Sequence, residues 1–172
     1  MTQTLAGKLA PVAPLALMGF LALPSVAEAA SPVRSQGNFG IGLGSGYRHS
    51  GISMKYFAGD THSLQGVVGT YGYDGSLGLS GSYLYEMPTI IGDNTGLELG
   101  WAVGGGPSIG LGDNFLALGA HGVIGLEFNI QPVPIDIVLE YKPSFRVYPD
   151  VEVDLYNFAG HIRFYPWGWS AK

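Results

Sequence analysis

The side chains of this sequence that could do chemistry are charged and imidazole groups that recur at every second position of short apolar segments. Carboxylates stand at this phase in four consecutive segments, and cations and histidines stand at the same phase in others. The set is Lys55, Glu86, Glu98, His121, Glu127, Asp136, Glu140, Lys142, His161 and Arg163. Alternate residues of an extended chain share a face, and unpaired buried charge is costly. We therefore predict that these groups face one interior and pair there as an ion-pair network.

Two more specific interpretations of this set have less support. Several carboxylates at one level could hold a cation, but their spacing is not a coordination motif. His121 and His161 could belong to a zinc or hydrolytic site, yet no short-spaced His or Cys pair and no HExxH sequence accompanies them. We predict hydrogen-bonded interior histidines and no catalytic, metal or cofactor site.

Two glycine-containing motifs match the sequences of functional loops but not the structural context that those loops require. Residues 106–110 read GPSIG, which matches the GxSxG of a nucleophile elbow. That elbow requires a strand, a sharp turn and a helix, whereas we expect this segment in a hairpin turn between two strands. Gly40, Gly42, Gly44 and Gly46 alternate along one segment with no helix after it, so they are not a phosphate loop. We expect them to leave interior room for bulky side chains opposite.

The elements that must position these groups are strands, because apolar and polar residues alternate with period two. Eight such segments cover 39–44, 52–57, 62–71, 77–86, 97–104, 116–128, 135–142 and 156–164. The facing of the third is ambiguous. Residues typical of turns separate these segments. We expect short loops at 47–50, 72–75, 107–113 and 148–152 at one end of the strands, and turns at 60, 87–95 and 132–134 at the other end. The sequence thus predicts an all-β fold, an eight-stranded antiparallel up-and-down transmembrane β-barrel.

The N-terminal residues 1–29 have the regions of a cleavable signal peptide. Lys8 precedes a Leu- and Ala-rich run, and Ala27 and Ala29 are the small residues before the expected cleavage site. Residues 30–172 then form one barrel domain. The chain has no cysteine, which excludes a lipoprotein anchor and disulfides. Only 12% of its residues are charged and 28 are glycine, unlike a soluble domain, where roughly a quarter are charged. The net charge of −5 argues against nucleic-acid binding.

Almost all of the mature chain resembles the small eight-stranded outer-membrane barrels of the OmpA and OmpX type. The last segment carries much of this resemblance, because Tyr156, Phe158, Ile162 and Phe164 alternate toward one face and end on an aromatic residue. The resemblance implies an outer-membrane location, contact with outer-membrane lipid, insertion by barrel-assembly machinery and a monomeric state. The chain departs from the pattern by continuing past Phe164 through Trp167 and Trp169 to Lys172.

Members of this structural class have structural, protective and enzymatic roles. The enzymatic members modify lipid A with Ser, His and carboxylate groups at the outer rim or lipid face. His62 and Ser63 are adjacent here, but the topology puts them at the opposite end, so we predict no enzyme. We expect a plugged polar lumen and a structural, envelope-integrity role. Two alternatives stay open: a narrow pore for ions or small solutes, and a soluble periplasmic lipocalin-like barrel that binds an apolar ligand.

Overall fold

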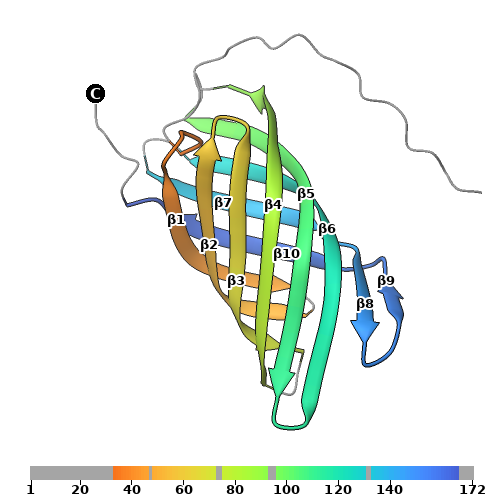
Figure 1. The fold of residues 1–172 in the computed structure, drawn as a ribbon. Helices are drawn as coiled ribbons and strands as arrows, with labels where there is room; N and C mark the ends of the chain where they lie inside the picture. The colour runs from red at the N-terminus through yellow and green to blue at the C-terminus, as the bar shows by residue number, and fades with distance from the viewer. Residues whose placement is uncertain (1–32, 47, 73–74, 93–95, 131–132, 167–172) are drawn as a thin grey trace, which may run out of the picture.

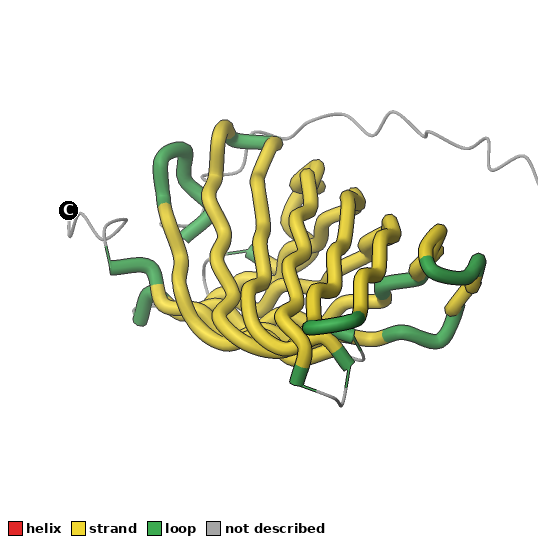
Figure 2. The backbone as a smooth tube through the Cα atoms, turned by 60° about the horizontal axis from the view of Figure 1, so that its bottom comes forward, coloured by secondary structure: helices red, strands yellow, loops and turns green. Residues whose placement is uncertain are grey.

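The computed structural model describes residues 33–46, 48–72, 75–92, 96–130 and 133–166. These residues form ten strands and no helix (Figures 1 and 2). None of them forms a helix that is long and apolar enough to cross a membrane. The strands are β1 (Phe39–Gly46), β2 (His49–Gly59), β3 (His62–Tyr71), β4 (Ser76–Ile91), β5 (Leu97–Gly112), β6 (Phe115–Ile130), β7 (Ile135–Tyr141), β8 (Ser144–Tyr148), β9 (Glu152–Asp154) and β10 (Phe158–Phe164).

The sheet closes on itself as an eight-stranded antiparallel barrel. Strands β1 to β7 pair in sequence order, β10 pairs with β7, and β10 also pairs with β1. The closing register places Ile41 opposite Phe164 and Gly46 opposite Ala159. Closure satisfies every sheet edge around the wall, and Figure 1 shows the strongly tilted strands that result. We call the end where β1 begins the N-terminal end and the opposite end the hairpin end.

The strand pairing of the barrel wall changes at the hairpin end, after β7. Strand β6 pairs with β7 over Ile124–Ile130 and then with β8 over Leu118–His121. Pro143 separates the two partner strands and has no N–H to donate, although its carbonyl accepts from the N–H of Gly122 at 2.9 Å. Strands β8 and β9 form a hairpin that projects beside the barrel (Figures 1 and 2).

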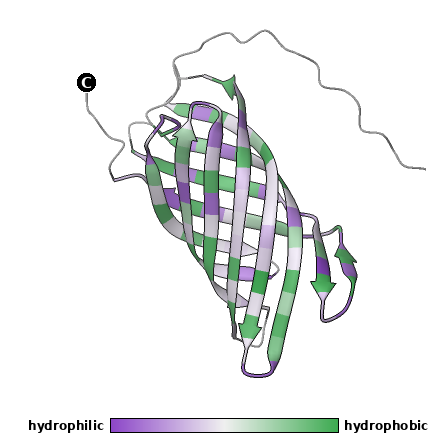
Figure 3. Ribbon diagram, viewed as in Figure 1, coloured by the Kyte–Doolittle hydropathy of each residue, from purple (hydrophilic) through white to green (hydrophobic). Residues whose placement is uncertain are grey.

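Along the barrel wall, most inward-facing side chains are polar or small and most outward-facing ones are apolar. Along β1, Leu43 is 68% exposed while the flanking glycines face the lumen. Leu139 and Ile162 are exposed on neighbouring strands, and Figure 3 shows this alternation along the strands. Two small clusters of buried apolar side chains occur among the described residues: Val33, Phe57 and Tyr165 at the N-terminal end, and Leu84, Ala102 and Val123 further along.

Two sequence-based strand boundaries and one expected loop length were wrong. Residues 87–91 belong to β4, with a register shift between Met87 and Ile91, and residues 107–112 belong to β5. Pro107 is paired with Ala120 on β6, but it has no partner among the residue pairs that join β4 to β5. A residue without an N–H is therefore tolerated inside this strand. The expectation that all loops at the hairpin end are short also fails, because residues 142–157 form the β8–β9 hairpin excursion. The proposed signal 1–29 and the tail after Pro166 lie outside the described residues.

Candidate functional site

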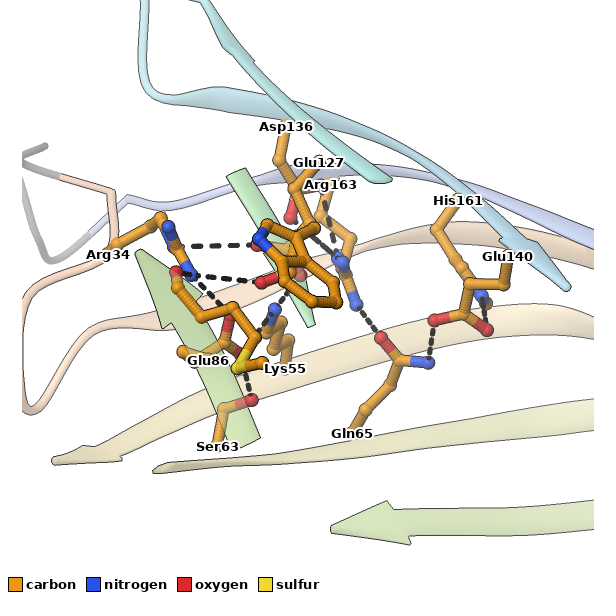
Figure 4. Close-up of polar contacts among 12 residues, drawn as sticks. Arg34, Lys55, Ser63, Gln65, Glu86, Glu127, Asp136, Glu140, His161 and Arg163 are labelled. Carbon is orange, nitrogen blue, oxygen red and sulfur yellow. Dashed lines mark hydrogen bonds and ion pairs between the residues drawn. The ribbon is translucent and has the colours of Figure 1, made fainter. Parts of the chain in front are cut away.

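The lumen holds a cluster of buried charges at the N-terminal end of the barrel (Figure 4). Lys55 of β2 lies between Glu86 of β4 and Glu127 of β6. Its Nζ is 2.8 Å from Glu86 Oε1 and also contacts Glu127 Oε1. The Lys55 Nζ lies 4.7 Å from the centre of the Phe57 ring as well. All three charged side chains have at most 2% of their surface exposed, so one cation offsets two carboxylates away from water.

A second cation enters this cluster from outside the strands. Arg34 precedes β1, and its guanidinium lies 2.9 Å from Glu86, 3.8 Å from Glu98 and 3.7 Å from Glu127. Burial opposes the charged form of Arg34, but the carboxylates outweigh it, led by Glu127, and raise its pKa above the ordinary value. Arg34 also donates to the carbonyl of Met87 at 3.1 Å. The segment before β1 therefore contributes a buried cation to this end of the lumen.

Sequence reasoning missed Arg34 because it lies outside any alternating segment. One signal was available: Arg34 is the only charged residue between Ala30 and Tyr47. The predicted carboxylates outnumber the predicted cations at this end, so a further cation was needed. Sequence distance gave no hint of the contact, because Arg34 and Glu86 are 52 residues apart.

Arg163 and Asp136 form the next pair, on the adjacent strands β10 and β7. Arg163 Nε donates to both oxygens of Asp136 at 3.0 and 3.1 Å, and Nη2 lies 2.9 Å from Oδ2. Tyr165, which the sequence analysis did not select, donates its hydroxyl to Asp136 Oδ2 at 2.6 Å. Arg163 is 1% exposed and Asp136 is fully buried. This arrangement gives the carboxylate hydrogen bonds from both sides, which such a buried charge requires.

Gln65 links the two halves of the lumen, and its facing had been ambiguous from sequence. Its Oε1 accepts from Arg163 Nη1 at 2.6 Å, and its Nε2 donates to Glu140 Oε1 at 2.7 Å. Glu140 Oε2 in turn lies 3.1 Å from His161 Nε2 and 3.9 Å from Lys142 Nζ. A continuous chain of polar contacts thus runs from Asp136 toward the hairpin end.

The structure therefore brings eight of the ten sequence-selected residues into ion pairs, places His161 in contact with Glu140, and leaves His121 with a different partner. His121 Nε2 lies 2.8 Å from the hydroxyl of Ser82. Glu98 lies near Arg34 and accepts from the hydroxyl of Thr89 at 3.2 Å. Every one of the ten is less than 10% exposed.

Glycines on the lumen face make room for these side chains. A Cβ at Gly40 would lie 2.5 Å from ring carbons of Tyr165, and one at Gly44 would lie 2.5 Å from Nδ1 of His161. A Cβ at Gly100 would lie 2.5 Å from Nη1 of Arg34. The expectation that the glycines of β1 leave space for bulky groups opposite is confirmed at Gly40 and Gly44.

The two enzyme-like motifs do not assemble catalytic geometry. His62 and Ser63 lie on opposite faces of β3: His62 Nδ1 is 2.6 Å from the exposed Tyr83 hydroxyl, whereas Ser63 is buried and donates to Glu86. Residues 106–110 lie within β5, not in a hairpin turn as expected. The Ser108 position continues into strand, whereas a nucleophile elbow needs a turn into a helix.

Among the described residues, no group of three or more His, Cys, Asp or Glu side chains has an arrangement that could hold a metal ion. Comparison with known proteins adds no identification, since no protein-family model, curated protein or solved structure matches the chain. What the arrangement itself provides is a set of complementary buried charges that links several strands of the barrel wall across the lumen.

Proposed function

We propose that this chain is a small outer-membrane β-barrel protein with a plugged polar lumen and a structural role in envelope integrity. One observation carries the proposal: the distribution of side chains is the reverse of that in a water-soluble domain. Lys55 and Arg163 are 1% exposed, whereas Leu43, Leu139 and Ile162 on the outer surface are 68%, 57% and 53% exposed. A soluble monomer rarely exposes so large a contiguous apolar surface.

A lipid bilayer can surround such a surface, because apolar side chains are more favourable in hydrocarbon than in water. The strands of the closed barrel also pair their backbone groups with neighbouring strands around the wall. Tyrosines add to this support. Tyr83 and Tyr85 lie near the middle of β4 and are exposed beside the ring of His62, the first residue of β3. Aromatic residues of this kind gather where a membrane meets water.

The rest of the proposal follows from this location. Residues 1–29 would direct export and be removed, barrel-assembly machinery would insert the chain, and outer-membrane lipid would surround it as a monomer. The resemblance to outer-membrane barrels of the OmpA and OmpX type is part of this proposal. A passive role is favoured because Arg34, Lys55 and Arg163 fill the N-terminal half of the lumen with paired groups.

The two alternatives have less support. A lipocalin-like barrel needs an apolar interior, whereas Glu127, Asp136 and Arg163 occupy this one. A pore needs a continuous water path, whereas Arg34 and Lys55 both reach Glu86 across the lumen.

The test is membrane fractionation of the exported full-length protein, with gel migration compared before and after boiling. We expect recovery in the outer membrane and a heat-dependent shift in mobility. Recovery as a soluble periplasmic protein would refute membrane insertion. Planar-bilayer recordings of the folded protein then test the plug: a silent bilayer is expected, and discrete channel steps that change in Arg163→Ala would replace the structural role with the pore.

A further inference from the structure

The β8–β9 hairpin exposes its apolar side chains and partly buries its polar ones. Phe145, Val147 and Val153 are 43%, 51% and 61% exposed. Arg146 and Glu152, which alternate with them along the two strands, are part-buried. In a soluble antiparallel sheet the apolar face packs on a core and the polar face is solvated, so this hairpin has the reverse arrangement.

The strand register places this apolar face on the outer side of the barrel wall. Ala120 of β6 is exposed and pairs with Phe145 of β8, and Phe145 pairs in turn with Val153 of β9. Directly opposed residues of an antiparallel sheet lie on the same face, so these three side chains form one outer row. The row continues the apolar outer surface of β6, where Leu116 and Leu118 are each 38% exposed.

The opposite face of the hairpin is polar and is tied to the end of the barrel. Gly119 of β6 pairs with Arg146, which pairs with Glu152. Glu152 Oε1 accepts from Arg48 Nη2 at 2.7 Å, and Glu152 Oε2 contacts Arg146 Nη2. Arg48 lies between β1 and β2. These contacts hold the polar face toward the barrel and leave the apolar face pointing away from it.

The outer edge of β9 limits how deep this face can lie in a membrane. Among the described residues, β9 pairs with β8 and with no other strand. Unpaired backbone groups are costly in hydrocarbon, whereas water at the level of the lipid headgroups satisfies them. Exposed tyrosines are typical of that level, and Tyr148 and Tyr156 next to the hairpin strands are 50% and 89% exposed.

We propose that the β8–β9 hairpin binds lipid at the membrane surface, with Phe145, Val147 and Val153 against the acyl chains that surround the barrel. Figures 1 and 2 show the hairpin beside the wall, so an inserted barrel brings this face against the neighbouring lipid. Amphipathic helices at a bilayer surface bury their apolar face about 5–10 Å into the boundary between headgroups and acyl chains, and we expect a similar depth here. The inference rests on the proposed membrane insertion and adds a lipid contact outside the wall.

The experiment attaches the environment-sensitive fluorophore NBD to single cysteines of the full-length protein, which has no cysteine of its own. Val153→Cys reports on the apolar face, and Val147→Cys reports on the same face if Val153→Cys does not fold. Asp154→Cys is the matched control, because it is the next residue of β9 and lies on the opposite face. Leu139→Cys, at a wall position that is 57% exposed, reports on membrane insertion separately.

Each labelled variant is folded into phosphatidylcholine vesicles, and its folding is checked by the heat-dependent shift in gel mobility. Two kinds of quencher are then compared. Nitroxides fixed at a shallow or a deep position of the phosphatidylcholine acyl chain report contact with lipid. Iodide on both sides of the membrane reports contact with water.

We expect the labels at Val153 and Val147 to show blue-shifted emission and to lose more fluorescence to the shallow nitroxide than to the deep one, whereas the label at Asp154 is quenched by iodide. If the Leu139 label contacts lipid but the Val153 and Val147 labels are as open to iodide as the Asp154 label, the hairpin proposal is overturned and membrane insertion stands. If iodide alone quenches the Leu139 label, membrane insertion fails and this inference fails with it. Protection of Val153 from iodide that is lost when the protein is diluted in lipid would assign the face to a second copy of the chain and overturn the lipid contact.

Discussion

Replacing Lys55 with Met would test whether the buried charge network holds the barrel together. Met keeps most of the aliphatic length of lysine and removes only the ammonium. Lys55 Nζ contacts both Glu86 and Glu127, and the three side chains are almost completely buried. After the change, Glu86 still has Arg34 at 2.9 Å and Ser63, whereas the remaining cation near Glu127 is Arg34 at 3.7 Å. The loss therefore falls mainly on Glu127.

The expected magnitude follows from that uneven loss. Removing one partner of a buried ion pair costs about 3–5 kcal/mol, because it leaves a buried charge uncompensated. We expect the free energy of unfolding of Lys55→Met to fall by this amount. Replacing the carboxylate as well, in Lys55→Met/Glu127→Met, removes the uncompensated charge and should recover at least about 2 kcal/mol. Arg146→Met is the control, since its pair with Glu152 is part-exposed and is worth about 0–1 kcal/mol.

The assay is equilibrium urea unfolding in lipid vesicles, followed by tryptophan fluorescence and by the mobility of unboiled protein on gels. A Lys55→Met variant within about 1 kcal/mol of the parent would refute a stabilising role for this cluster. A double variant no more stable than Lys55→Met would show that the loss does not arise from the unpaired Glu127 carboxylate.

Three further substitutions test the packing and the outer surface. Gly40→Ala should lose about 1–3 kcal/mol in the same unfolding assay, because its Cβ would lie 2.5 Å from the Tyr165 ring; Gly81→Ala, which has nothing within 4 Å, should be neutral or gain up to about 1 kcal/mol. Tyr165→Phe removes the 2.6 Å hydrogen bond to Asp136 and should cost about 1–3 kcal/mol; an unchanged urea midpoint would contradict this. Leu139→Lys puts a charge on an outer position that is 57% exposed and should cost about 2–4 kcal/mol in vesicles if that position faces lipid; equal stability of Leu139→Lys and Leu139→Ala would contradict lipid contact.

Many residues of the candidate site could be predicted from the two-residue alternation of side chains along each strand. Lys55, Glu127 and Arg163 fall on the face shared with glycine and serine because successive side chains of a strand point to opposite faces. That rule fixes which groups are inside, but not which touch. Lys55 and Glu127 are 72 residues apart, and their contact depends on barrel closure and on the tilt that brings β2 across from β6.

Proline limited the prediction of strand boundaries. Pro107 suggested a turn, since proline lacks a ladder donor. In the barrel it is tolerated inside β5, because the pairs that join β4 to β5 skip Pro107. Pro143, in contrast, does mark a break, between β7 and β8. The same residue type gives different outcomes because the need for its N–H depends on the neighbouring strand.

The sequence by itself determined the all-β class, the eight wall positions and the inward facing of the charged groups, because alternation is a local property of an extended chain. The tertiary structure alone decided how the charges pair. It brought Arg34 from outside the strands onto Glu86, made Gln65 the link between Arg163 and Glu140, and placed the apolar face of the β8–β9 hairpin beside β6. Such contacts depend on register and closure, which are set by the sum of all strand pairings and not by any one segment.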